Sequence, residues 1–383
     1  MAYFDNAATT YPKPECVYRA MDEFYRRFGG NAGRGNYALS QSAASLIAET
    51  RVRIQNLLHC PAKNVIFTPS ATIALNMVLQ GLLRNSLSVH TVYISPFEHN
   101  AVTRVLHFLK QVSNIEIKTL TVDSALKYDL ERIRYQFDGC KPDMVIISHA
   151  SNVTGQIAPV KEIFTLAKAY KAMTVLDMAQ TAGLVDINIG SELYDFAVFA
   201  GHKTLYGPTG LSGFVMNPMV DLPPVLFGGT GFDSANQDMP ASIPERYEMG
   251  TLNISGVAGL HAALGWIQEI GIDNLWKVES NHRSRLLRLL KNYDFIRIID
   301  CDEDELHAGI VSGLVDGISS DSAGGVFAER GIAVRTGLQC APLAHQTLGT
   351  FPSGTIRFST GYFTTDDDFS ELESALDDIE ENL

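Results

Sequence analysis

The chain has little cysteine, few basic residues relative to acidic ones, and no long hydrophobic run. Its five cysteines are scattered over 383 residues without a C-x-x-C pair, which argues against a disulfide framework and against a zinc site. A net charge of −13 disfavours binding to nucleic acid or to an anionic membrane. No apolar run approaches the roughly 20 residues of a membrane span, and the first residues lack the basic and apolar regions of a signal peptide. We therefore expect a cytoplasmic protein without a metal site.

Hydrophobic residues, at 46% of the chain, are plentiful enough for a large core, and the length of 383 residues favours two domains. From residue 65 onward, short apolar stretches alternate with amphipathic patterns, which predicts an α/β fold with a mostly parallel sheet buried on both faces. The expected strands are 65–68, 91–95, 115–122, 144–148, 174–177, 196–200 and 211–216. The expected helices between them are 72–83, 100–110, 126–137 and 160–171.

The alternation stops after residue 216. Residues 217–254 are rich in glycine and proline, and a loop of this length inside a compact protein is usually functional. Helices and strands then follow in a mixed order, which predicts a smaller α+β domain. We place the large domain at 15–255 and the small C-terminal domain at 256–383, with residues 1–14 packed against the small domain.

The most informative stretch is the end of the strand 196–200, which leads into Gly201-His202-Lys203 and a Gly-Pro turn. A lysine at the end of a buried strand loses solvation, so that its amine becomes nucleophilic and suited to a Schiff base with pyridoxal 5'-phosphate (PLP). A single lysine there is more often part of a solvated basic turn. Asp177, at the end of another apolar strand, favours the cofactor because a carboxylate can pair with the pyridine nitrogen.

Other strands also end in specialised side chains, and ligands of open α/β sheets bind outside the carboxyl ends of the strands. Ser70, Ala71 and Thr72 begin a helix, and a helix N-terminus carrying hydroxyl groups is suited to a phosphate. His99 can lie on the ring face and Gln180 can bond to the ring's phenolic oxygen. Taken alone, His99 is more often a structural histidine, and its place at a strand end is what favours the functional interpretation.

Five motifs together carry a resemblance to a known family. They are Asp5-Asn-Ala-Ala-Thr-Thr-Tyr-Pro-Lys-Pro, Ser-Asn152-Val-Thr-Gly, Asp177-Met-Ala-Gln180, Gly-His202-Lys203-x-x-x-Gly-Pro and Arg335-Thr-Gly-x-x-Cys340. In this order, and over the whole chain, they resemble the cysteine desulfurase and selenocysteine lyase family of class V aminotransferases. The resemblance implies PLP fold type I, with PLP as the cofactor and L-cysteine or a related amino acid as the substrate.

The resemblance also implies a role for each matching residue. Lys203 matches the Schiff-base lysine that later moves a proton, and Asp177 matches the partner of the pyridinium nitrogen. The resemblance implies that His99 stacks on the ring face. It implies that Gln180 and Asn152 lie near the phenolic oxygen and the substrate, and that Thr72 and His202 contact the phosphate. Thr251 resembles a phosphate contact lent by a neighbouring subunit, which implies a homodimer. Arg357, with Arg335, is implied to hold the substrate carboxylate.

Cys340 matches the nucleophile that takes sulfur from cysteine as a persulfide and leaves alanine. Two features depart from the family pattern. Ala200 stands where many relatives have a hydroxyl residue that reaches the phosphate, so that this contact is absent or comes from Ser70. Leu338 and Gln339 precede Cys340 where relatives often have histidines. The short interval from Arg335 to Cys340 resembles the branch that needs a partner protein to accept the sulfur.

Three alternatives remain open at this stage. A selenocysteine lyase has the same fold and site, whereas an aminotransferase or β-lyase would use Lys203 and Asp177 without Cys340. A sulfur-relay protein without activity is the third alternative, and the intact set of Lys203, Asp177, His99 and Arg357 disfavours it.

Overall fold

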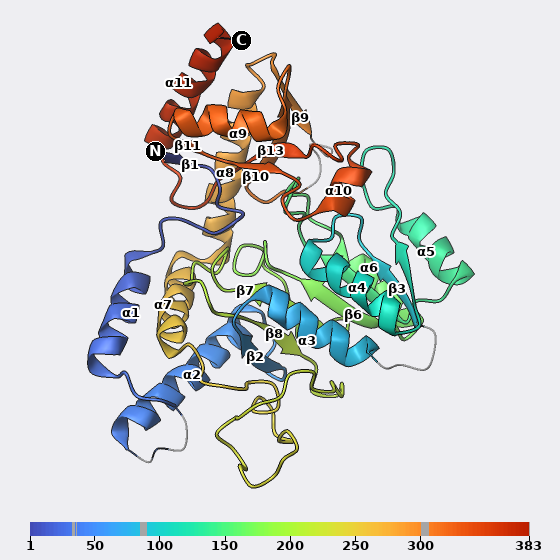
Figure 1. Cartoon of the computed structure of the whole chain (residues 1–383), viewed down its shortest axis with the longest axis vertical. Coiled ribbons are helices and arrows are strands. Elements are labelled where there is room, and N and C mark those ends of the chain that lie inside the picture. Colours follow the sequence, from blue (N-terminus) through green and yellow to red (C-terminus); the bar gives the residue numbers. More distant parts are fainter. Residues whose placement is uncertain (33–34, 36, 85–89, 300–305, 383) are drawn as a thin grey trace.

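The computed structural model describes residues 1–32, 35, 37–84, 90–299 and 306–382. It shows a large sheet surrounded by helices, a smaller sheet beside it, and the two chain ends close together on the smaller unit (Figure 1). This arrangement confirms the α/β fold with a mostly parallel main sheet. None of the helices in the described ranges is long and apolar enough to cross a membrane.

The large sheet has seven strands in the order β2-β8-β7-β6-β5-β3-β4. From β7 to β4 the neighbours are parallel, whereas β8 is antiparallel to both β2 and β7. The strands are almost fully buried, as the uninterrupted apolar stretches require, except for the edge strand β4, which is partly exposed. Their bounds are β2 Asn64–Thr68, β3 His90–Ile94, β4 Ile115–Thr119, β5 Met144–Ser148, β6 Met173–Asp177, β7 Phe196–Ala200 and β8 Ser212–Met216.

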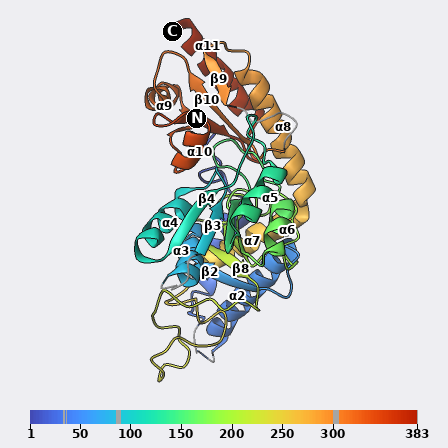
Figure 2. The ribbon, with the colours of Figure 1, turned by 90° about the vertical axis from the view of Figure 1, so that its right-hand side faces the viewer.

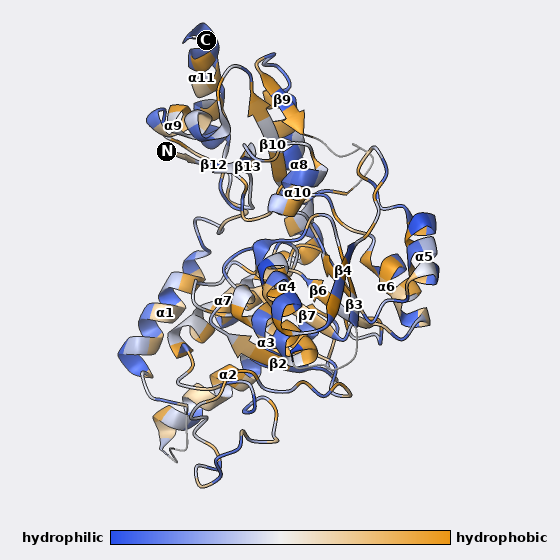
Figure 3. Ribbon diagram, turned by 45° about the vertical axis from the view of Figure 1, so that its right-hand side comes forward, coloured by the Kyte–Doolittle hydropathy of each residue, from blue (hydrophilic) through white to orange (hydrophobic). Residues whose placement is uncertain are grey.

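Helices cover both faces of this sheet (Figure 2). One hydrophobic cluster joins the sheet to α2, α5, α6 and α7, and a second joins the opposite face to α3 and α4. The buried side chains of these helices lie in the two clusters, and Figure 3 shows hydrophilic residues on the outer sides of α4 and α5. The bounds are α2 Ala38–Leu57, α3 Ala71–Leu83, α4 Asn100–Val112, α5 Leu130–Gly139, α6 Val160–Ala169 and α7 Ile254–Ile270.

The small sheet is antiparallel, in the order β12-β13-β10-β9. Its core consists of side chains from α8, α9 and α11 packed on the sheet. The bounds are α8 Ile272–Leu290, β9 Ile296–Ile299, β10 Ile310–Val315, α9 Ser320–Glu329, β12 Arg335–Gly337, α10 Pro342–Thr347, β13 Thr355–Ser359 and α11 Asp366–Asn382.

The N-terminal segment is more extensively attached than the sequence suggested. Strand β1 (Ala2–Tyr3) pairs in parallel with β11 (Ile332–Ala333), and Phe4 lies in the core of the small unit. The chain then crosses to the large sheet before helix α1 (Glu15–Arg27). Strands of two or three residues have no detectable periodicity, which explains why β1, β11 and β12 were not predicted.

Helix α7 belongs to the core of the large unit, because Val257, Leu260 and Leu264 lie in the same hydrophobic cluster as α2. The expected boundary near residue 255 therefore cuts through this core, whereas a boundary at Gly271, between α7 and α8, leaves it whole. Residues 217–253 form neither helix nor strand, and they are the long yellow loop below the large sheet in the view of Figure 1.

Candidate active site

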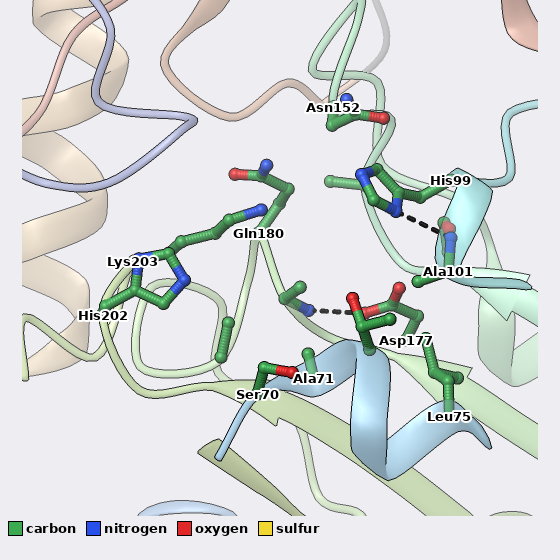
Figure 4. A pocket seen from close by; sticks show the side chains of 15 residues that line it. Ser70, Ala71, Leu75, His99, Ala101, Asn152, Asp177, Gln180, His202 and Lys203 are labelled. Atoms are coloured by element: carbon green, nitrogen blue, oxygen red, sulfur yellow. Dashed lines mark hydrogen bonds between the residues drawn. The ribbon is translucent and has the colours of Figure 1, made fainter. Parts of the chain in front are cut away.

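A cavity of about 200 Å³ opens at the carboxyl ends of β5, β6 and β7. The ends of parallel strands meet at one edge of a sheet, and the polar residues that follow them converge there. Figure 4 shows these side chains pointing toward one another around the cavity. Except for Thr251, the lining includes every residue predicted for the cofactor: Ser70, Ala71, Thr72, His99, Asn152, Asp177, Gln180, His202 and Lys203.

Lys203 points its amine into the cavity (Figure 4), without a hydrogen bond to any residue that the structure describes. Burial lowers its pKa to about 8, against a smaller opposing effect of the Asp177 carboxylate. A larger fraction of the amine is therefore neutral and nucleophilic near neutral pH than in an exposed lysine.

Asp177 is buried, and its Oδ1 accepts a hydrogen bond of 2.9 Å from the amide of Ala179. Burial raises the pKa of this carboxyl, against smaller opposing effects of the Ala179 hydrogen bond and of the nearby Lys203. One donor of the Gln180 amide is already used, because its Nε2 donates to the carbonyl of Ala7 at 2.9 Å. Gln180 thus joins the N-terminal segment to the cavity.

His99 is fixed at the start of α4, where its Nδ1 accepts a hydrogen bond of 3.0 Å from the amide of Ala101. Burial, followed by the nearby Lys203, lowers its pKa to about 4. The ring is therefore neutral at pH 7, and since Nδ1 accepts, the proton is on Nε2. The preceding Glu98 is fully buried beneath the site and accepts hydrogen bonds from the amide and hydroxyl of Ser148 at 2.6 and 2.8 Å.

The N-terminus of α3 forms the opposite wall of the cavity. The hydroxyl of Ser70 caps the helix by accepting from the amide of Ile73, so the amides of Ala71 and Thr72 have no acceptor within the helix. Nδ1 of His202 is buried without a hydrogen-bond partner among the described residues. These donors suit an anion such as phosphate. Ala200 offers no hydroxyl here, whereas the Ser70 oxygen accepts in the cap and keeps its O–H as a donor for an anion.

The N-terminal segment holds the backbone of the lysine loop, which sequence reasoning missed. The carbonyl of His202 accepts from the hydroxyl of Thr9 at 3.0 Å and from the ammonium of Lys13 at 2.6 Å. The hydroxyl of Thr10 donates to the carbonyl of Lys203 at 3.1 Å. Burial lowers the pKa of Lys13 to about 7. The quoted N-terminal motif was the available signal, but its residues had been assigned no role.

Arg357 lies in the small sheet and is buried, outside the lining of the cavity. Its Nη1 donates to the carbonyl of Asn152 at 2.8 Å, its Nη2 contacts Asp5 at 2.9 Å, and its Nε has no partner among the described residues. Arg335 lies directly opposite Arg357 in the β12–β13 register and is exposed. Asp5 was not expected, and it occupies the face of Arg357 that a substrate carboxylate could also use.

Cys340 is exposed on the turn between β12 and α10. The amide of Asn100, next to His99, donates to the carbonyl of Cys340 at 2.7 Å. The Nδ2 of Asn152 donates to the carbonyl of Gln339, also at 2.7 Å. The turn is therefore attached to two residues beside the cavity, although the thiol itself lies outside the lining.

Thr251 lies away from this cavity. It is exposed and lines a separate groove with Arg51 and Glu248, on the side of the long loop. Within one chain, the structure does not bring Thr251 to Lys203.

The aminotransferase class-V family matches residues 2–372 of the chain. The chain belongs to the class-V aminotransferase family. A probable cysteine desulfurase of Pyrococcus abyssi is 32% identical, with 99% of this chain and 93% of that protein covered. A cysteine desulfurase of Thermococcus onnurineus superposes with a TM-score of 0.88 at 28% identity, covering 100% of this chain and 95% of the other. A cysteine desulfurase of Escherichia coli gives 0.84 at 26%, with coverage of 100% and 95%.

Proteins of this family depend on PLP, and the site fits that cofactor. Lys203 has a free amine in the cavity, Asp177 is a buried carboxylate, and the start of α3 has amides without an acceptor in the helix, in the same lining as His202, whose Nδ1 is buried without a partner among the described residues. PLP has a phosphate, a protonatable ring nitrogen and an aldehyde, which match these three features.

Proposed function

We propose that the chain is a PLP-dependent cysteine desulfurase that converts L-cysteine to L-alanine and holds the sulfur as a persulfide on Cys340. Relatives over the full length of the chain carry the name cysteine desulfurase, and they support this activity. The observation that carries the proposal is the position of the Cys340 turn, whose backbone is bonded to Asn100 and Asn152 at the edge of the lysine cavity.

Bound PLP supplies an electron sink for the carbon skeleton of the substrate. Lys203 is the group for the covalent bond to the cofactor, and its free amine, once released, moves protons at the substrate carbon. Asp177 would pair with the ring nitrogen and favour its protonated form, the neutral imidazole of His99 would contact the ring, and the start of α3 with His202 would hold the phosphate.

Arg357 binds the substrate carboxylate, with Arg335 beside it on the same face of the sheet. The thiolate of Cys340 then attacks the substrate sulfur. A sulfur–sulfur bond forms while the carbon–sulfur bond breaks, and its electron pair stays with the carbon skeleton, which takes up a proton and leaves as alanine. No external oxidant is needed.

A homodimer is the second part of the proposal. In the long loop, Leu226, Phe227 and Phe232 are exposed by 40%, 73% and 52%, and a second copy of the chain would cover them. Thr251 lies at the end of the same loop and would reach the phosphate site of the other copy. Sedimentation of the protein and of Phe227→Ser tests this, since the variant should weaken the dimer.

Transfer of the persulfide to a partner protein is the third part. The exposed Cys340 leaves the sulfur accessible from outside. Alanine release from cysteine should rise when a suitable acceptor is added, because the acceptor removes the sulfur from Cys340, and a rate that no acceptor or thiol changes would exclude this part.

The decisive experiment follows the fate of L-cysteine with the purified holoenzyme. Alanine should appear, and peptide mapping should find one additional sulfur atom on Cys340. Parallel reactions with selenocysteine compare the two substrates. Formation of a keto acid without alanine would instead identify an aminotransferase or a β-lyase.

A further inference from the structure

The turn that carries Cys340 has an unfavourable backbone conformation. Gln339 and Cys340 have φ angles of 40° and 57°, in the left-handed region that residues other than glycine rarely adopt. Two such residues in succession cost free energy, and they persist only where surrounding contacts fix them. Something in the structure must therefore hold this turn.

The side chain of Gln339 provides the attachment to the small sheet. It is buried, with 6% exposed. Its Nε2 donates to the carbonyl of Thr355 in β13 at 2.7 Å, and its Oε1 lies 2.7 Å from Nε2 of His345. His345 is fully buried, and its Nδ1 lies 2.7 Å from the hydroxyl of Thr350.

These contacts determine a single arrangement of protons. The carbonyl of Thr355 can only accept, so the amide nitrogen of Gln339 faces it and the amide oxygen faces His345. His345 must then donate from Nε2 and accept at Nδ1 from the hydroxyl of Thr350. Burial lowers the pKa of His345 to about 4, which agrees with a neutral ring of this tautomer.

The main chain of the same turn is attached to the large unit. The carbonyls of Gln339 and Cys340 accept from Asn152 Nδ2 and from the amide of Asn100, each at 2.7 Å. The side-chain network thus fixes the turn to one sheet while its carbonyls fix it to the edge of the cavity that belongs to the other.

We propose that Gln339 is a positioning residue for sulfur transfer, and that the Gln339–His345–Thr350 network holds the Cys340 thiol where it meets the substrate sulfur. Gln339 points away from the cavity and takes no part in proton transfer. This inference rests on the proposed desulfurase function, because it assigns Cys340 the role of nucleophile.

The test compares Gln339→Ala with two matched controls. Leu338→Ala changes the same turn at a side chain outside the network, and Thr347→Val removes a hydroxyl of α10 that donates to the carbonyl of Leu343, away from the network. In Gln339→Ala, kcat for alanine release should fall roughly ten- to a hundredfold, since small misplacements of reacting groups have effects of this size. KM for cysteine and the cofactor absorbance should stay unchanged, because the cavity is intact.

Hydrogen exchange supplies a readout that does not depend on activity. The amides of Ala341 and Asn100 both bond to carbonyls of the turn, so their exchange should accelerate in Gln339→Ala and stay unchanged in the two controls. His345→Gln retains a donor toward Gln339 and should have an intermediate effect, and Thr350→Val should have the smallest. If Gln339→Ala does not fold, the exchange rates and kcat of these two variants test whether the network positions the turn.

A folded Gln339→Ala that transfers sulfur at the wild-type rate would overturn the proposal, as would equal losses in the Leu338→Ala control. If the wild-type protein itself forms no alanine from cysteine, the proposed function fails. The exchange rates would still show whether the network fixes the turn.

Discussion

The cavity around Lys203 and the turn around Cys340 are built in opposite ways. The cavity lies on the ends of buried strands, where Asp177 and the lysine loop are placed by the sheet itself. The turn lies between β12 and α10 with Cys340 exposed, and it depends on hydrogen bonds to β13 of the small sheet and to Asn152 beside the cavity. Binding of the cofactor therefore depends on the rigid core, whereas sulfur transfer depends on how two units are held together. Variants in the two regions should fail in different steps.

The largest effect is expected from Lys203→Ala. It removes the amine that bonds to the cofactor, so the visible absorbance and alanine formation should both disappear while the melting temperature changes little. Lys161→Ala, an exposed lysine of α6, is the control and should retain both. An unchanged spectrum in Lys203→Ala would assign the Schiff base to another lysine.

Cys340→Ala should separate the two regions most clearly. The cofactor absorbance and the binding of cysteine should survive, because the cavity is unaltered. Alanine formation from cysteine should fall by orders of magnitude and the persulfide should be absent, whereas partial activity on selenocysteine should remain. Cys16→Ala removes another exposed cysteine and should behave as the wild type. Undiminished alanine release from cysteine by Cys340→Ala contradicts the mechanism.

Asp177→Asn tests the cavity alone. Without the carboxylate the ring nitrogen loses its charged partner, and kcat should fall by roughly a hundredfold or more, as when other preorganised charges are removed. Alkylation of Cys340, measured by peptide mapping, should proceed at the wild-type rate. Wild-type turnover in this variant would exclude the assigned role of Asp177.

Arg357→Ala should mainly weaken the binding of cysteine. Loss of charge-assisted hydrogen bonds should raise KM for cysteine roughly ten- to a hundredfold, with a smaller rise in Arg335→Ala because Arg335 is exposed. Steady-state rates over a range of cysteine concentrations measure both. Larger effects from Arg335→Ala would reverse the two assignments.

The smallest effect concerns pH. In the proposed role of Lys203 only its neutral amine would bond to PLP, and the pKa of this amine is lowered to about 8. The rate at which cofactor-free protein recovers its absorbance with PLP should rise with pH up to about 8 and then level off. The Asp177 carboxylate raises the pKa of Lys203, so Asp177→Asn should move the midpoint to lower pH. A midpoint near that of an exposed lysine would mean that the amine is not desolvated.

The sequence by itself determined the main sheet and the residues at its strand ends. Continuous apolar stretches predicted every strand of the large sheet to within a few residues, and reading just past those strands found Asp177, Gln180, His99 and Lys203. The physical reason is local. A strand of a buried parallel sheet is a continuous apolar run in the sequence, and ligands bind outside its carboxyl end.

Only the tertiary structure revealed how the remaining parts meet. Asp5 lies 352 positions from Arg357, Lys13 lies 189 from His202, and Asn152 lies 187 from Gln339, yet each pair is in contact. Hydrogen bonds between such distant residues leave no periodic pattern in a single sequence. The family resemblance identified Cys340 and Arg357 but not their hydrogen-bond partners. A motif shows which residue occupies a position, whereas only the packed structure shows which of its atoms are hydrogen-bonded.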